Sequence, residues 1–167
     1  MPHAPHRRGS KREAALGLLT VSDTRTEEDD RSGTVARRLI ESAGHRVADY
    51  RIVPDEPADV RRVVEDWLAR DDCDGVVVNG GTGVSARDRT YEALAGLLDK
   101  RLDGFGEIFR QLSFEQVGSA AMLSRAVGGI ARAKPLFALP GSPEAVELAL
   151  ERLILPELAH LLDELAK

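Results

Sequence analysis

Carboxylates and glycines follow apolar runs in this chain of 167 residues, and their types suggest phosphate chemistry. Asp55 follows the alternating run 45–53, and Asp88 lies shortly after the glycine-rich segment NGGTG (79–83). Glu107 ends the predicted turn GFGE. Backbone N–H groups of a glycine loop can surround a phosphate, and Mg²⁺ binds through one or two carboxylates together with substrate phosphates. The pattern indicates a site for Mg²⁺ and a phosphate-bearing ligand. The alternative is that Asp55 and Asp88 serve only as cap or turn residues.

The histidines argue against other catalytic chemistry. His3 and His6 lie near the N-terminus, His45 begins a predicted strand, and His160 lies in the last predicted helix. None is near the glycine-rich segment, so a histidine metal cluster, a histidine base and a Ser–His or Cys–His pair are not expected. Cys73 stands between two aspartates, whose negative charge disfavours a reactive thiolate.

Two common nucleotide-binding motifs do not account for the glycine loop. The P-loop string GxxxxGK[ST] does not occur anywhere in the sequence. Residues 81–86 (GTGVSA) match the dinucleotide pattern GxGxxA, but they follow the third predicted strand rather than the first. The acidic residue that this pattern requires ~20 residues later, at the end of a following strand, is missing. A nicotinamide-type dinucleotide is therefore not the expected ligand.

The composition is that of a globular protein, with 43% hydrophobic and 31% charged residues. We expect residues 14–167 to form one domain and residues 1–13, which are rich in Arg and Lys, to form a disordered basic tail. The net charge is −5 and only 4% of residues are aromatic, so no surface for nucleic acid is expected. We also expect no signal peptide and no membrane span. A single cysteine fits a reducing cytoplasm.

Hydrophobic periodicity predicts alternating strands and helices in the first half of the chain. The predicted order is strand 14–21, helix 32–43 capped by Ser32, strand 45–53, helix 58–70, strand 76–78 and helix 90–98. This order is typical of an α/β domain with a doubly wound, mostly parallel sheet. Such sheets bind ligands at the carboxyl ends of their strands, which is where the glycine loop and Asp55 lie.

The second half of the chain is less regular. Its pattern predicts a loop that enters a helix over 102–117, and then a short helical turn and an irregular strand over 122–130. A further strand is predicted at 136–139. Ser142 followed by Pro143 predicts the capped start of a long helix, with a kink or restart at Pro156.

Taken together, these segments resemble the MoaB/Mog family of molybdenum cofactor biosynthesis proteins. The likeness extends from Leu19 to the last helix. The segments that carry it are LTVSDTR (19–25), AGHRV (43–47), VPDE (53–56), NGGTG (79–83) with RD (87–88), GFGEIFRQLSFEQVG (104–118), LSRAVGGI (123–130) and ALPGSPEAVELA (138–149). The combination is specific, although no single segment is.

The resemblance implies a three-layer α/β/α molybdopterin-binding fold that assembles into homotrimers or homohexamers, with possible transient contacts to other proteins of the pathway. It also implies adenylylation of molybdopterin, in which the terminal phosphate of the pterin attacks the α-phosphate of Mg-ATP and releases pyrophosphate. At the matching positions, Asp55 and Asp88 would bind Mg²⁺ and align the two phosphates. The other residues implied to bind pterin or nucleotide are Ser22, Gly80, Gly81, Thr82, Gly83, Glu107, Ser124, Pro140, Gly141 and Ser142.

The sequence departs from the usual family motifs at Asn79, Arg89, Tyr91, Asp103 and Glu144. Glu144 is the most consequential, because a carboxylate near a helix N-terminus competes with a phosphate for the helix dipole. These departures support a second hypothesis, a non-catalytic carrier or scaffold that holds molybdopterin. Molybdenum insertion, the activity of multidomain relatives, is not expected of a single domain. Because both aspartates and the loop glycines are present, adenylyltransferase activity is the expected function.

Overall fold

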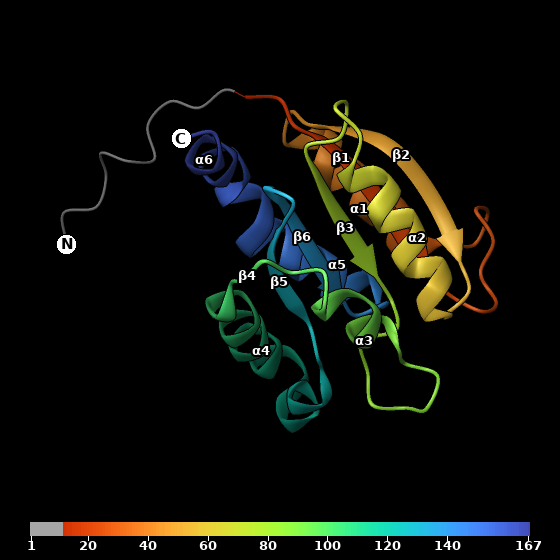
Figure 1. The fold of residues 1–167 in the computed structure, drawn as a ribbon. Coiled ribbons are helices and arrows are strands. Elements are labelled where there is room, and N and C mark those ends of the chain that lie inside the picture. The colour runs from red at the N-terminus through yellow and green to blue at the C-terminus, as the bar shows by residue number, and fades with distance from the viewer. Residues whose placement is uncertain (1–11) are drawn as a thin grey trace, which may run out of the picture.

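The computed structural model describes residues 12–167, which form a six-stranded sheet between two layers of helices (Figure 1). The strands are β1 (Ala15–Val21), β2 (Arg46–Val53), β3 (Gly75–Asn79), β4 (Lys100–Arg101), β5 (Val127–Ala131) and β6 (Lys134–Leu139). Their order in the sheet is β2-β1-β3-β6-β5-β4. The first four strands in this order are mutually parallel, whereas β5 is antiparallel to both β6 and β4.

Helices cover both faces of the sheet. The helical segments are α1 (Arg31–Ser42), α2 (Pro57–Leu68), α3 (Thr90–Ala95), α4 (Asp103–Val117), the 3-10 helix η1 (Gly118–Leu123), α5 (Pro143–Ala149), the π-helical turn η2 (Leu150–Ile154) and α6 (Leu155–Leu165). One hydrophobic core joins α1, α4, α5 and α6 to the sheet, and a second joins α2 and α3 to the opposite face. The predicted three-layer, mostly parallel α/β fold is therefore confirmed. Within residues 12–167 no helix has both the length and the apolar character needed to cross a membrane.

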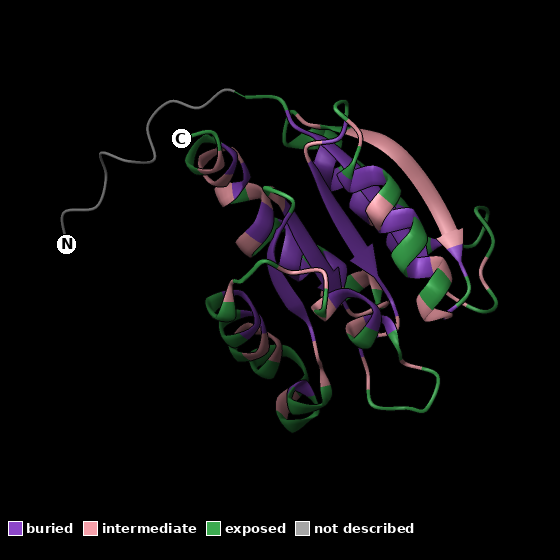
Figure 2. Cartoon of the chain, in the orientation of Figure 1, coloured by how far each residue is buried: buried purple, intermediate pink, exposed green. Residues whose placement is uncertain are grey.

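Strand β1 contributes to both cores because alternate side chains of a strand point to opposite faces. Leu16 and Leu18 belong to the core beneath α1, and Leu19 and Val21 belong to the core beneath α2. Figure 2 shows the central strands and the inner helix faces as the buried part of the molecule. Full burial of each leucine is worth about 1.5–3 kcal/mol. The cores thus hold the central strands firmly and fix the positions of the loops at their ends.

The first six predicted elements are confirmed to within a few residues at each end, but the predicted cap of α1 is wrong. Asp30, not Ser32, is the N-cap residue, and its Oδ1 accepts a hydrogen bond from the N–H of Gly33 at 3.0 Å. Ser32 lies inside the helix and donates its hydroxyl hydrogen to the carbonyl oxygen of Gly141. Gly44, just past the end of α1, has φ +84°, a conformation that favours glycine.

The second half differs more from its prediction. Helix α4 begins at Asp103, so GFGE is the first turn of a helix rather than a turn that precedes one. Strand β4 was not predicted, because two residues are too few to show a period of two. The predicted cap at Ser142 and the restart at Pro156 are confirmed. Residues 1–11 of the predicted basic tail lie outside the described part of the chain, so that prediction stays untested.

Candidate functional site

The glycine loop lies at the point where the order of successive strands in the sheet changes direction. Strand β1 is flanked by β2 on one side and β3 on the other, so the carboxyl ends of β1 and β3 form a topological switch point. Gly80 follows β3 with φ +101°, and a Cβ atom on Gly80 would lie 2.2 Å from the carbonyl oxygen of Val21. On the other side, a Cβ on Gly141 would lie 3.2 Å from the Cα of Gly80. The ends of β1, β3 and β6 therefore lie against one another, and the close approach of Gly80 to Val21 requires glycine.

Gly81 lies against the predicted catalytic carboxylate. Its φ is +71°, and a Cβ on Gly81 would lie 2.1 Å from Thr90 Oγ1 and 2.4 Å from Asp55 Oδ2. Asp55 is 5% exposed, and its carboxylate accepts long hydrogen bonds of 3.3 and 3.4 Å from the N–H of Arg89. The Thr90 hydroxyl is fully buried and has no hydrogen-bond partner within residues 12–167. The inner wall of the loop thus presents a carboxylate and an unsatisfied hydroxyl side by side.

The electrostatic environment of Asp55 is unfavourable for its charge. Burial raises the pKa of Asp55, and the negative charges of Asp88 and Asp23 raise it further, against the opposing effects of the Arg89 N–H and the Arg87 guanidinium. No ion pair to a Lys, Arg or His side chain forms at Asp55 within 4.0 Å in residues 12–167. A buried carboxylate with a raised pKa is a candidate functional group.

Asp88, the second predicted carboxylate, lies on the opposite side of the glycine loop. Its Oδ2 accepts a hydrogen bond from the N–H of Ser85 at 2.9 Å and would lie 2.8 Å from a Cβ on Gly83. Both predicted aspartates therefore also have a local structural role, since each accepts from a backbone N–H of this loop. Asp55 lies against Gly81 and Asp88 against Gly83, so both carboxylates border the glycine loop.

Asp23 belongs to the same cluster and was missed by the sequence prediction. Its Oδ1 accepts a hydrogen bond from the N–H of Asp55 at 3.0 Å and an ionic hydrogen bond from Arg87 at 2.8 Å. Arg87 also binds Glu56 at 3.0 Å, and its hydrogen bonds lower the pKa of Asp23. The available signal was position: Asp23 follows β1 at the same edge of the sheet as Asp55.

A buried hydrogen-bond network connects the strands and the helix next to the site. Asp30 Oδ2 accepts hydrogen bonds from the hydroxyl of Thr20 at 2.6 Å and from that of Tyr50 at 2.5 Å. Asn79 Nδ2 donates to Thr20 Oγ1 at 3.1 Å, which links β3 to this network. Burial and the bond to Asp30 raise the pKa of the Tyr50 phenol above its usual range. The Asp30 carboxylate thereby joins β1, β2 and the start of α1, and Thr20 extends the network to β3.

The donor set can be compared with the needs of Mg²⁺. Among residues 12–167, no group of three or more His, Cys, Asp or Glu side chains is arranged to hold a metal ion. Mg²⁺ does not require such a group, because it keeps water or substrate phosphate oxygens in most of its six positions. A poorly compensated Asp55, a nearby Asp88 and the unsatisfied Thr90 hydroxyl fit an ion that arrives with a phosphate ligand. They do not fit a pre-formed site made only of protein ligands.

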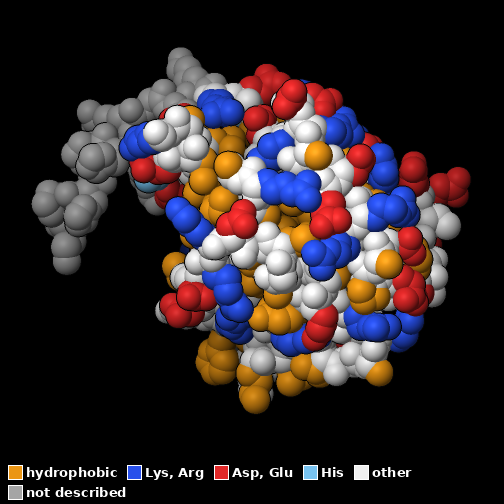
Figure 3. All heavy atoms as spheres, viewed as in Figure 1, with side chains coloured by type: hydrophobic (Ala, Val, Ile, Leu, Met, Phe, Trp, Pro, Cys, Tyr) orange, Lys and Arg blue, Asp and Glu red, His pale blue; other side chains and the backbone are white. Residues whose placement is uncertain are grey.

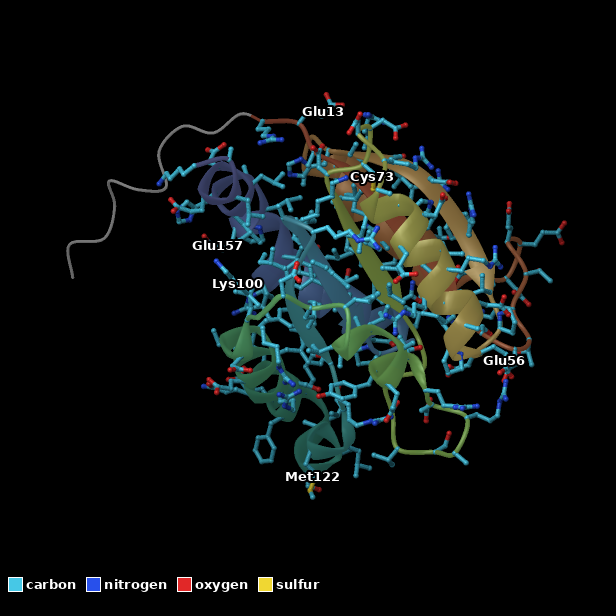
Figure 4. All side chains as sticks on the ribbon, in the orientation of Figure 1. Glu13, Glu56, Cys73, Lys100, Met122 and Glu157 are labelled. Carbon is cyan, nitrogen blue, oxygen red and sulfur yellow. The ribbon has the colours of Figure 1, made fainter. Side chains whose placement is uncertain are left out.

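Two open cavities border the cluster. One of about 420 Å³ is lined by Val84, Asp88, Arg89 and Arg125, together with Ser85, Ala86 and Glu92. The other, of about 360 Å³, is lined by Ser22 and Asp23 at the end of β1 and by neighbouring residues of β2. In Figure 4 the label of Glu56 marks the loops at this edge of the sheet. The glycine loop and its carboxylates thus lie beside two hollows of the surface.

The remaining predicted site residues have varied positions. Ser22 Oγ accepts hydrogen bonds from the N–H groups of the following turn, and Ser142 caps α5 beside Pro140. Ser124 Oγ accepts from the N–H of Ala126 at 3.3 Å. Glu107 is exposed on α4 and lines a separate cavity of about 110 Å³, which shares no lining residue with the cavity at the glycine loop. Glu107 is therefore the predicted residue that the fold does not bring to the loop.

A more apolar cavity of about 530 Å³ lies elsewhere, between α4 and α6. Phe105, Ile108, Phe137 and Leu161 contribute to its lining, and it contains no residue of the glycine loop or of the carboxylate cluster. The largely apolar lining offers little to a phosphate ligand, which requires hydrogen-bond donors and positive charge. The polar edge at β1 and β3 is therefore the better candidate site.

Residues 17–160 match the family described as "probable molybdopterin binding domain". The chain belongs to this molybdopterin-binding domain family. It is 47% identical over 163 residues to molybdenum cofactor biosynthesis protein B of Halalkalibacterium halodurans, covering 97% of this chain and 96% of that protein. It is 48% identical over 151 residues to the protein of the same name from Bacillus subtilis, covering 90% and 89%.

Solved structures of the molybdopterin-binding domain family share the fold. A crystal structure of molybdenum cofactor biosynthesis protein B superposes with a TM-score of 0.91 at 48% identity, covering 93% of this chain and 97% of that chain. The tungsten cofactor synthesizing protein MoaB from Pyrococcus furiosus gives a TM-score of 0.85 at 37% identity, covering 93% and 98%. The family resemblance read from the sequence is therefore confirmed.

Proposed function

We propose that this protein acts in molybdenum cofactor biosynthesis by adenylylating molybdopterin with Mg-ATP. The observation that carries the proposal is Asp55, a buried carboxylate with a raised pKa that lies against Gly81 of the glycine loop and feels the charge of Asp88. The family membership of the chain and the names of its relatives support a role in molybdenum cofactor biosynthesis. The chemistry of the site supports the reaction type, because the arrangement suits a divalent cation that accompanies phosphates.

The chain's own groups would align two phosphates rather than exchange protons. The Gly80 N–H already donates to the carbonyl oxygen of Leu139 at 2.9 Å, so the predicted role of its amide is not available. Backbone N–H groups of Gly81–Gly83 would bind the nucleotide phosphates, and Asp55 and Asp88 would hold Mg²⁺. The ion, when bound, supplies positive charge that neutralises the reacting phosphates. The attacking phosphate of the pterin is largely deprotonated at neutral pH, because a phosphate monoester has its second pKa at ~6. No general base is then required, which agrees with the distance of His45 and His160 from the loop.

The histidine positions support that chemistry. His45 Nδ1 accepts a hydrogen bond from the N–H of Ala14 at the amino end of β1, opposite the glycine loop. His160 lies on α6, where its ring nitrogens are 3.3 and 3.5 Å from carboxylates of the same helix. Neither ring can reach the phosphates. Positioning and charge neutralisation, which are the main contributions in phosphoryl and nucleotidyl transfer, are left to the loop and its carboxylates.

The test is a transfer assay with the purified protein, molybdopterin, Mg²⁺ and ATP labelled at the α-phosphate. We expect labelled adenylylated pterin and one equivalent of pyrophosphate. Asp88→Asn should lower the rate by at least about 10²-fold, the scale of a lost positioning or electrostatic contact. Asp163→Asn, on the exposed side of α6, is the matched control and should leave the rate unchanged. Pterin binding without pyrophosphate release would instead identify the carrier or scaffold of the alternative hypothesis.

We also propose that the protein forms homo-oligomers through the end of α4 and η1. Phe114 is 61% exposed and Met122 is 78% exposed, and Val117 and Leu123 add to this apolar surface. Figure 3 shows hydrophobic side chains gathered along the lower edge of the view, and Figure 4 places Met122 there. Contiguous exposed apolar surface commonly marks a protein interface.

Light scattering of the wild-type protein tests this assembly. A trimer or hexamer is expected, and Phe114→Glu combined with Met122→Lys should reduce the mass toward that of one chain. Arg61→Glu, a charge change on the exposed side of α2, should leave the mass unchanged. A wild-type protein that remains monomeric at every concentration would contradict the proposal.

A further inference from the structure

Arg125 makes more contacts with the glycine loop than any role assigned above requires. It lies in the short segment between η1 and β5, far along the chain from residues 80–92. Its backbone N–H donates to the carbonyl oxygen of Thr82 at 2.9 Å. Its side chain donates from Nε to the carbonyl oxygen of Gly83 at 2.8 Å and from Nη2 to that of Asp88 at 2.8 Å. One guanidinium thus fastens both ends of the loop segment 84–87.

The guanidinium is itself held in place from two sides. The Glu92 carboxylate on α3 accepts from both Nη1 and Nη2, and the Arg125 guanidinium lies 5.3 Å from the centre of the Tyr91 ring. The Tyr91 hydroxyl accepts a hydrogen bond from Arg101 Nη1 at 3.0 Å. Tyr91 is one of the positions at which this sequence departs from the usual family motifs. The stacked arrangement is therefore a feature of this chain that no motif predicted.

The other ties of the loop are weaker or more exposed. Arg87 binds Asp23 and Glu56, but these three side chains are 53%, 40% and 47% exposed, so solvent screens their attraction. The side chain of Arg125 is 30% exposed, and its bonds reach main-chain carbonyls, which cannot move independently of the loop. Residues 84–87 are otherwise exposed. A loop with three glycines needs such an anchor, because each glycine adds backbone freedom.

We propose that Arg125 is a positioning residue, which fixes Asp88 and the amide of Gly83 relative to Asp55 so that both phosphates can be aligned. The proposal rests on the adenylyltransferase function proposed above. Without the guanidinium, the carbonyl groups of Gly83 and Asp88 lose their donors and the carboxylate of Asp88 is spread over several orientations. Misplacement of a reacting group by about 1 Å can cost 10²-fold in rate.

Steady-state kinetics give the first readout. Arg125→Met should lower kcat by about 10- to 100-fold with a much smaller change in the KM for pterin, because the Arg125 guanidinium is already occupied by the carbonyl groups of Gly83 and Asp88 and by Glu92. Arg125→Lys keeps the charge but loses the planar fork that reaches two carbonyls at once, and should remain closer to Arg125→Met than to the wild type. Arg132→Met is the matched control: Arg132 is also ion-paired, although its side chain is more exposed, at 53%, and it lies away from the loop, bound to Glu65.

Limited trypsin digestion of the ligand-free protein gives a second readout that needs no activity. Cleavage after Arg87 and Arg89, followed by mass spectrometry, reports how often the loop opens, since proteolysis tracks the population of open states. We expect Arg125→Met to be cut at these two sites several-fold faster than the wild type and than Arg132→Met. Its melting temperature should change little, which would separate local loosening of the loop from global unfolding.

The two readouts separate the proposals. A wild-type protein without adenylyl transfer would refute the proposed function, while faster loop cleavage in Arg125→Met would still establish the anchor. Unchanged cleavage after Arg87 and Arg89 would overturn the positioning role, as would full activity of Arg125→Met. Full rescue of kcat by Arg125→Lys would also overturn it, because positive charge alone would then account for the effect.

Discussion

Replacing Gly81 with alanine should push apart the groups that form the inner wall of the site. The new Cβ would lie 2.1 Å from Thr90 Oγ1 and 2.4 Å from Asp55 Oδ2, both well inside normal contact distance. Thr90 is fully buried and Asp55 is 5% exposed, so neither side chain can turn toward solvent without disturbing the loop. Alanine also disfavours the φ of +71° at this position.

Two other glycines separate these effects. Gly44 has φ +84° with no atom within 4 Å of its Cβ position, so Gly44→Ala tests the backbone conformation alone. Gly96 has φ −72° and no atom within 4 Å of its Cβ position, so Gly96→Ala tests neither the backbone conformation nor a steric clash. We expect a loss of about 1–2 kcal/mol for Gly44→Ala and a gain of about 0.4–1 kcal/mol for Gly96→Ala. With an added overpacking cost, Gly81→Ala should lose roughly 2–5 kcal/mol.

Urea unfolding at one fixed protein concentration measures the three free energies, and the transfer assay measures activity. Gly81→Ala should lose nearly all adenylyl transfer, whereas the other two variants should keep it when folded. The reasoning is refuted if Gly81→Ala is no less stable than Gly44→Ala, because the contact with Thr90 and Asp55 would then cost nothing.

Other changes probe the charges around the loop. The pKa of Asp55 is raised in the folded state, so its ionised form opposes folding at neutral pH, and this penalty disappears as the pH falls toward ~3.9. Asp55→Asn should therefore melt at a higher temperature than the wild type at pH 7, and the difference should shrink near pH 4. The same variant should lose activity. Mg²⁺ added with ATP should raise the melting temperature of the wild type above the value with ATP alone, and an equal effect on Asp55→Asn would contradict a role of Asp55 in holding the ion. Tyr50→Phe removes a hydrogen bond to the buried carboxylate of Asp30 and should cost about 1.5–3 kcal/mol in urea unfolding; a loss below 0.5 kcal/mol would mean that Thr20 and Gly33 already satisfy Asp30 fully.

The central strands and first three helices were predictable because their apolar side chains recur at the spacing typical of buried strands and amphipathic helices. Val76–Val78 form a short apolar run that is buried on both faces, and α1 and α2 bury regular apolar stripes. The sheet edge was not predictable in the same way. Strand β4 has two exposed residues, and the glycines of β5 are required by neighbours that are distant in sequence: a Cβ on Gly129 would lie 2.3 Å from the carbonyl oxygen of Lys100.

Choices among similar residues also depended on distant contacts. Either Asp30 or Ser32 could cap α1 by local rules. Asp30 takes the position because Thr20 and Tyr50, on two different strands, both donate to its carboxylate. The expectation that Cys73 is unreactive agrees with its raised pKa. The largest cause is burial, which the sequence did not show, and the nearby charges of Lys134 and Arg70 oppose the shift.

Within the candidate site, only the residues that directly follow the parallel strands were predictable. The positions of Gly80, Gly81 and Asp55 follow from three parallel strands that end at one edge. Asp23 could have been added by the same argument. Arg125 could not, because its role depends on where an irregular segment after η1 returns to the loop, and no sequence period records that path. Which of these residues act on a ligand stays a prediction.

The charge of the site bears on the choice between an enzyme and a carrier. A carrier that only holds a pterin phosphate gains from hydrogen-bond donors and cations, and a carboxylate beside the phosphate weakens binding because like charges repel. Asp55 and Asp88 lie beside the glycine loop, and Arg87, whose positive charge reaches Asp55, is already bonded to Asp23 and Glu56. Retaining a buried carboxylate whose ionisation opposes folding makes sense if a divalent cation joins the site with its phosphates. A triphosphate carries such an ion, whereas the pterin phosphate alone does not require one. The carboxylates therefore favour a nucleotide-using enzyme, and pyrophosphate release is the measurement that decides between the two functions.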